Sequence, residues 1–139
     1  MKFKFLILLV IAIFFSGCTT TKISKTSFRE DILHSIDFYE VWKQERHPGS
    51  EAVSIPCFDI EEDEFREAVN TYGVECWERE LENAPDMLSD SDLESLQPSV
   101  ANCVETKILK RFKEDFTFDK SPEYLEHCKK IYQKLKRLR

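Results

Sequence analysis

The chain has 139 residues and a formal charge of −6, because 26 acidic residues outnumber 20 basic ones. An acidic chain is not drawn to nucleic acid, whose binding depends on lysine and arginine contacts with phosphates. The sequence holds only 3 glycines and 5 prolines, which argues against a turn-rich all-β fold and against low-complexity sequence. The length suits a single domain.

The chain begins with a short apolar segment. It extends from Phe3 to Phe15, is interrupted by Lys4 and ends in the small residues Ser16 and Gly17. A membrane-spanning helix needs about 20 apolar residues, so this segment is too short to span. A charged start, a short apolar core and small residues at its end are typical of a secretory signal peptide.

The end of this segment, FSGC at residues 15–18, resembles the lipobox of bacterial lipoproteins. The resemblance implies cleavage before Cys18, a diacylglycerol thioether on that cysteine and an acyl chain on the new amino terminus. Phe15 departs from the pattern, whose first position is usually leucine or a smaller aliphatic residue. Enteric-type bacteria retain lipoproteins with an aspartate after this cysteine in the inner membrane. Thr19 stands there, which implies the outer membrane, facing the periplasm.

The resemblance divides the chain into a signal peptide at 1–17, a lipidated tether at 18–26 and a helical periplasmic domain at 27–139. Several acyl chains on Cys18 would hold the protein firmly on its membrane, whereas one chain anchors only reversibly. Loss of Lys2 and Lys4 with the leader leaves 18 of the 20 basic residues and all 26 acidic ones, so the charge becomes −8. The polar stretch TTTKISKT at 19–26 predicts a flexible tether.

Two helices are predicted directly after the tether. The first extends from residue 27 to about 46, because Ser27 and Glu30 form a capping-box pattern and HPGS at 47–50 ends the helix. The second extends from about residue 60 to 82, behind a second capping-box pattern at Asp59 and Glu62. Gly73 weakens this helix and would allow a bend.

Two further helices follow a connector at residues 83–98, which is predicted to hold one short helical turn. The third helix begins at Pro98 and carries apolar residues at i, i+4 steps, namely Val100, Val104, Ile108, Phe112 and Phe116. The fourth begins behind Ser121 and Pro122 and has a cationic end that complements the helix dipole. The sequence therefore predicts an all-α fold, a small four-helix up-down bundle.

The remaining cysteines are Cys57, Cys76, Cys103 and Cys128, an even number in an oxidising compartment, which predicts two disulfides. A continuous second helix separates Cys57 from Cys76 by on the order of 25 Å, far beyond the roughly 7 Å that a disulfide allows. Cys76 and Cys103 lie at matching heights of an up-down bundle. We therefore expect Cys76–Cys103 and Cys57–Cys128, with buried free thiols as the alternative.

No catalytic pattern is recognised. The sequence has no glycine-rich phosphate loop, no serine-centred elbow and no paired-histidine metal helix. DSDLE at 90–94 resembles the start of a calcium loop but lacks its glycine and distal glutamate, and EEDE at 61–64 is interpreted as a solvated helix start. His127 and Cys128 face different sides of a helix, which argues against zinc. We interpret His34 and His47 as surface residues, and expect no metal, no cofactor beyond the acyl chains and no small-molecule substrate.

Two aromatic residues, Trp77 and Phe38, lie off the predicted apolar stripes and are candidate contacts for a protein partner. The sequence therefore favours a non-enzymatic adaptor that binds another protein of the cell envelope. Helical pilotins of secretion systems are an analogy in size, anchoring and disulfide content, without a shared motif. An acidic inhibitor of a basic cell-wall hydrolase such as lysozyme is the alternative, because opposite charge speeds association.

Overall fold

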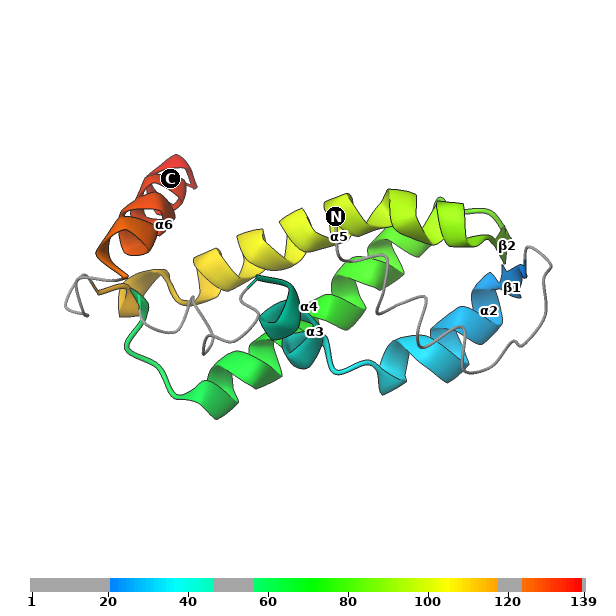
Figure 1. Ribbon diagram of the computed structural model, residues 1–139, viewed down its shortest axis with the longest axis horizontal. Coiled ribbons are helices and arrows are strands. Elements are labelled where there is room, and N and C mark those ends of the chain that lie inside the picture. Colours follow the sequence, from blue (N-terminus) through cyan, green and yellow to red (C-terminus); the bar gives the residue numbers. More distant parts are fainter. Residues whose placement is uncertain (1–20, 47–56, 118–123, 139) are drawn as a thin grey trace.

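The computed structural model describes residues 21–46, 57–117 and 124–138, and it is mostly helical, as predicted (Figure 1). Two long helices, α4 (Glu62–Leu81) and α5 (Asp90–Arg111), form an antiparallel hairpin. A shorter helix, α3 (Phe38–Arg46), lies against α4, and α6 (Leu125–Arg137) lies at the end of the hairpin where α5 finishes. Within the described residues, no helix is both long and apolar enough to cross a membrane.

Both predicted cysteine pairs are present. Cys76 and Cys103 join α4 to α5 with their Cα atoms 6.0 Å apart, and Cys57 and Cys128 join the segment before α4 to α6 with their Cα atoms 5.3 Å apart. The first bond closes the hairpin across its middle, and the second fixes α6 to the hairpin's end.

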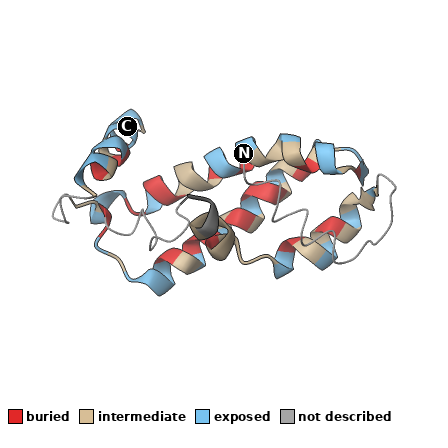
Figure 2. Cartoon of the chain, viewed as in Figure 1, coloured by how far each residue is buried: buried red, intermediate tan, exposed pale blue. Residues whose placement is uncertain are grey.

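Buried residues recur along α4 and α5 from one end of the hairpin to the other (Figure 2). They form two clusters. One joins α3, the first half of α4, the end of α5 and α6, and contains Phe65 and Phe112 with ring centroids 6.0 Å apart. The other joins the first described segment to the opposite end of the hairpin, and contains Phe28 and Trp77 with centroids 5.5 Å apart.

The predicted first helix is wrong, because the segment is broken into short pieces. Helix α2 (Lys25–Ser27) continues into a π-helical turn (Phe28–Ile32) and a 3₁₀ turn (Leu33–Ser35), and the backbone is extended at Ile36 before α3 begins. Ser27 is not the cap, since the Ser24 hydroxyl accepts the Ser27 N–H at 3.0 Å. A four-helix up-down bundle is therefore not confirmed.

The third helix begins eight residues earlier than predicted. The Ser89 hydroxyl accepts the Asp92 N–H while the Asp92 carboxylate accepts the Ser89 N–H, and this capping box starts α5 at Asp90. The box offsets the hydrogen bond that Pro98 cannot donate inside the helix. Pro98 is exposed on this helix.

The ends of the other helices also differ from the predictions. Helix α4 begins at Glu62 without a side-chain cap, so the predicted cap at Asp59 is wrong. The predicted start of the fourth helix, Ser121 with Pro122, lies outside the described residues, and α6 begins at Leu125.

A small two-stranded sheet was not predicted. Strand β1 (Ile23–Ser24) pairs antiparallel with β2 (Met87–Leu88), in register Ile23 with Leu88. Strands of two residues are too short to produce a periodic sequence pattern. The pairing joins part of the segment expected to be a tether to the α4–α5 turn.

Gly73 lies where α3 meets α4. The helix continues through this residue, and a Cβ built there would lie 2.4 Å from Cγ of Phe38. Any side chain at this position would push Phe38, and with it the start of α3, away from α4. The glycine is therefore explained by close approach of two helices.

We predict that Gly73→Ala lowers the free energy of unfolding by about 1–3 kcal/mol, the usual cost of overpacking, despite a gain of about 1 kcal/mol in helix propensity. Urea unfolding of the oxidised protein measures the change. In a Phe38→Ala background the same substitution should be neutral or stabilising. A Gly73→Ala protein more stable than the wild type would contradict this explanation.

Candidate functional site

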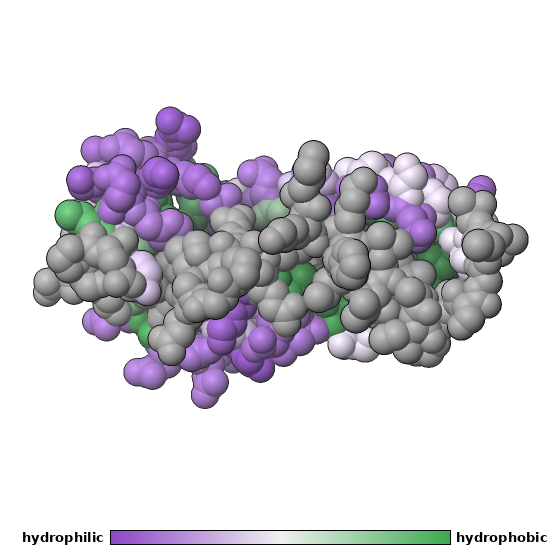
Figure 3. Space-filling view, viewed as in Figure 1, coloured by the Kyte–Doolittle hydropathy of each residue, from purple (hydrophilic) through white to green (hydrophobic). Residues whose placement is uncertain are grey.

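An apolar groove with a cavity volume of about 240 Å³ extends between α3, α4, α5 and α6. We call it the α3–α6 groove. Its apolar walls include Phe38, Val41 and Trp42 of α3, Val69 and Trp77 of α4, Val100, Val104 and Ile108 of α5, and Ile131 of α6. In Figure 3, small areas of apolar surface are visible near the middle of the molecule. Four helices therefore share one apolar depression.

The rim of the groove is polar. Gln97 and Glu105 of α5 lie on one side, and His127, Lys130 and Lys134 of α6 lie on the other. The Lys134 ammonium forms an ion pair with the Glu105 carboxylate and so links α6 to α5. An aromatic and aliphatic floor with a charged rim is typical of a protein-binding surface.

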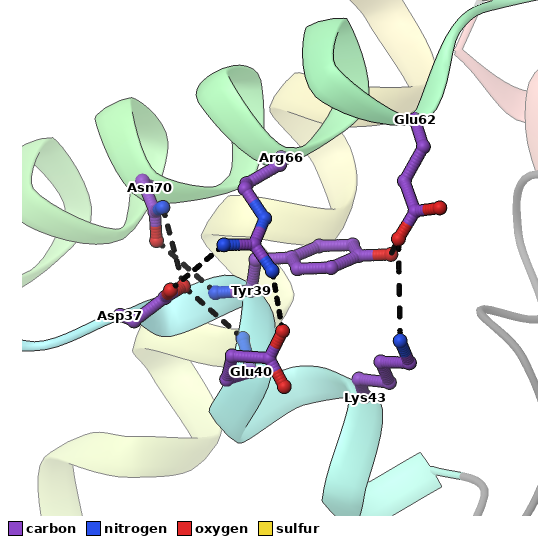
Figure 4. A network of polar contacts seen from close by, with 7 residues as sticks. All are labelled: Asp37, Tyr39, Glu40, Lys43, Glu62, Arg66 and Asn70. Carbon is purple, nitrogen blue, oxygen red and sulfur yellow. Dashed lines mark hydrogen bonds and ion pairs between the residues drawn. The ribbon is translucent and has the colours of Figure 1, made fainter.

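The α3 wall is held on α4 by a network of polar contacts at the start of α3 (Figure 4). The Asp37 carboxylate caps α3 by accepting the Glu40 N–H at 3.2 Å. It also accepts hydrogen bonds from the Asn70 amide and the Arg66 guanidinium, each at 3.3 Å. Because Arg66 and Asn70 are four residues apart on α4, both reach the same carboxylate.

Tyr39 extends this network toward the start of α4. Its side chain is fully buried, its hydroxyl donates to the Glu62 carboxylate at 2.7 Å, and the Arg66 guanidinium lies 4.8 Å from its ring centroid. Burial and the neighbouring Glu62 carboxylate raise the pKa of Tyr39 well above its usual range. The hydroxyl is thus held protonated and bonded, as expected of a residue that positions α3.

Both predicted partner contacts line the groove, but they differ in exposure. Phe38 is half-buried, whereas Trp77 is only 3% exposed and packs against Phe28. The inference that Trp77 lies off the buried face of its helix is wrong, because the first described segment covers that side of α4. Phe38 is the more accessible of the two.

The other candidate residues from the sequence analysis do not form a common site. Cys18 and His47 lie outside the described residues, and His34 is exposed. The acidic residues at 61–64 are exposed, as predicted, and Asp92 belongs to the cap of α5. Within residues 21–46, 57–117 and 124–138, no three potential metal ligands cluster.

The sequence interpretation missed the cap of α3 and hence its position. The signal is the spacing of Asp37 and Glu40 ahead of Val41 and Trp42, which is the same capping-box pattern as that of Ser27 and Glu30. Two competing caps ten residues apart could not be ranked from the sequence. The cap at Asp37 prevails because Arg66 and Asn70 meet it across α4.

No protein-family model matches this chain, and no curated protein or solved structure is significantly similar to it. Its function is therefore inferred from its own residues.

We predict that Tyr39→Phe lowers the free energy of unfolding at pH 7 by about 0.5–1.5 kcal/mol, the net worth of one hydrogen bond. A pKa raised by folding stabilises the native state fully below about pH 10, where unfolded tyrosine is protonated, and the benefit is lost as pH rises further. Denaturant unfolding from pH 7 to 11 should show a steeper decline for the wild type than for Tyr39→Phe. If the free energies of unfolding of the two proteins declined in parallel with pH, Tyr39 would not have a raised pKa.

Proposed function

We propose that this chain is a non-enzymatic lipoprotein of the bacterial cell envelope that binds another protein in the α3–α6 groove. Anchoring through Cys18 at the periplasmic face of the outer membrane is part of the proposal, and rests on the FSGC motif and on Thr19. The two disulfides agree with an oxidising compartment. The groove is the observation that carries the proposal.

The size and shape of the groove favour a protein partner over a small molecule. Its volume of about 240 Å³ is below the range of about 300–1,000 Å³ that ligand pockets usually have. Its apolar lining is distributed over four helices, with half-buried aromatic side chains at Phe38 and Trp42. Apolar anchors of a bound helix, spaced three or four residues apart, suit such a depression.

The hydrolase inhibitor remains the second candidate, because exposed acidic residues gather at the start of α4. Glu62, Asp63, Glu64 and Glu67 are all exposed near the start of α4. A basic enzyme would be attracted to them over several ångströms, and that attraction would fall as salt screens it. Binding in the apolar groove would depend much less on salt.

Site-specific photo-cross-linking tests the adaptor proposal. A photoreactive amino acid replaces Ala101, which is exposed and lines the groove, or the adjacent Asn102, which is exposed and does not line it. We expect one identified envelope protein to be cross-linked from position 101 and not from position 102. The yield should change little with salt, because apolar burial drives the contact.

A blocking substitution provides the control. In purified components, Ala101→Trp should weaken binding of that protein by tenfold or more, on the order of 1.4 kcal/mol, while Asn102→Trp should leave it unchanged. Equal cross-linking from both positions would refute the groove as the binding site. A salt-sensitive complex with lysozyme that Ala101→Trp does not affect would favour the inhibitor.

A further inference from the structure

The last described helix has a charge opposite to that of the chain. Helix α6 carries Lys129, Lys130, Lys134, Lys136 and Arg137 and one acidic residue, Glu126, so its net charge is +4 in a chain of charge −6. All five cationic residues are exposed. Figure 3 shows hydrophilic side chains gathered over this helix.

The cations share one side of α6. With about 100° between successive residues, the buried Cys128, Ile131 and Leu135 occupy one narrow stripe, and the five cations are distributed over an arc of about 160° on the other side. We call this arc the α6 cationic face. Its only other exposed residues are Glu126 and Gln133, so the positive charge is not interrupted by an acidic row.

Local ion pairs leave most of this charge available. Lys129 lies 3.5 Å from Glu126, and Lys134 pairs with Glu105 of α5. Both are contacts between solvated groups, which contribute little and exchange easily. Counting Glu105 with the helix still leaves a net charge of +3.

The orientation of the face is fixed. The Cys57–Cys128 disulfide and the burial of Ile131 and Leu135 hold the apolar stripe against the hairpin. The cations therefore remain on the exposed side of α6, which lies at one end of the molecule (Figure 1).

The chemistry of the face suits a fluid anionic surface. Four of its five cations are lysines, which act as hydrated point charges and do not form the bidentate fork that arginine offers to a fixed carboxylate. The face is the outer surface of a helix, and Leu125, which is 39% exposed, lies beside Lys129 and Lys136 on the helical wheel. Lysines with an adjacent exposed leucine are typical of helices that contact lipid headgroups.

We infer that the α6 cationic face binds anionic phospholipid headgroups and, given the proposed lipid anchor at Cys18 on which this part of the inference rests, is a second contact between this chain and its membrane. The first described strand, β1, lies with β2 at the opposite end of the hairpin from α6 (Figure 1). Helix α5 alone spans about 33 Å between those ends. A chain attached through its amino-terminal region therefore lies along the membrane when α6 is bound, because an upright molecule would hold α6 several screening lengths away.

Lysine footprinting of the full chain in vesicles tests this inference. The protein is reconstituted into phosphatidylcholine alone or with added phosphatidylglycerol, acetylated briefly and analysed by mass spectrometry. In about 0.1 M salt we expect Lys130 to react about fivefold more slowly on the anionic vesicles, the factor for one cation held at such a surface. In about 1 M salt, where the screening length is about 3 Å, the difference should vanish.

Two triple variants separate α6 from general charge effects. Lys129→Gln, Lys136→Gln and Arg137→Gln together should abolish the slower reaction of Lys130, and none of these residues lines the groove. Lys107→Gln, Lys110→Gln and Lys113→Gln, an equal change in charge, should preserve it. Equal Lys130 reactivity on both kinds of vesicle would overturn the inference. Protection in native envelopes without protection on anionic vesicles would also overturn it, and would assign the face to an acidic protein.

Discussion

The Cys57–Cys128 bond is the constraint on which the groove depends. Helix α6 has 13 residues and buries only Cys128, Ile131 and Leu135, and a helix of that length is marginal without tertiary support. Cys57, the other cysteine of this bond, is held in place by the segment that follows α5. Its carbonyl accepts the Thr117 N–H at 2.9 Å, and the adjacent Phe58 forms a β-bridge with Phe116. In the chain-entropy account, closing a loop of 71 residues contributes about 4 kcal/mol.

The two sides of the groove are thus held by different chemistry. Helix α3 is docked by hydrogen bonds and ion pairs around Asp37 and Arg66, and by the close approach of Phe38 to Gly73. Helix α6 is docked by a covalent bond and a short apolar stripe. Between them, the α4–α5 hairpin with its own disulfide supplies a floor that neither side helix forms. This division lets one side of α6 complete an apolar groove while the other side presents its lysines to solvent.

The mostly helical character of the fold and the disulfide pairing could be predicted from regularities of the sequence. The i, i+4 apolar steps indicate helices, and the rise per residue places Cys76 beside Cys103. The break before α3 could not be predicted, because Phe28, Ile32 and Ile36 keep helical spacing across it. The cap at Asp37 is selected by contacts with α4, which the sequence does not reveal. The start of α5 was predicted at Pro98 because proline favours the first turn of a helix. The capping box of Ser89 and Asp92 starts the helix at Asp90 instead. The groove could not be predicted from the sequence, because four helices line it. The apolar spacing within each helix does not say how the helices pack together.

Amide hydrogen exchange on the Cys57→Ser, Cys128→Ser protein measures whether the Cys57–Cys128 bond makes α6 a wall of the groove. We expect the amides of α6 to lose protection while those of α4 and α5, still joined by Cys76–Cys103, keep theirs. Unchanged protection throughout α6 would show that apolar packing alone holds the helix in place, and that the groove does not depend on the bond.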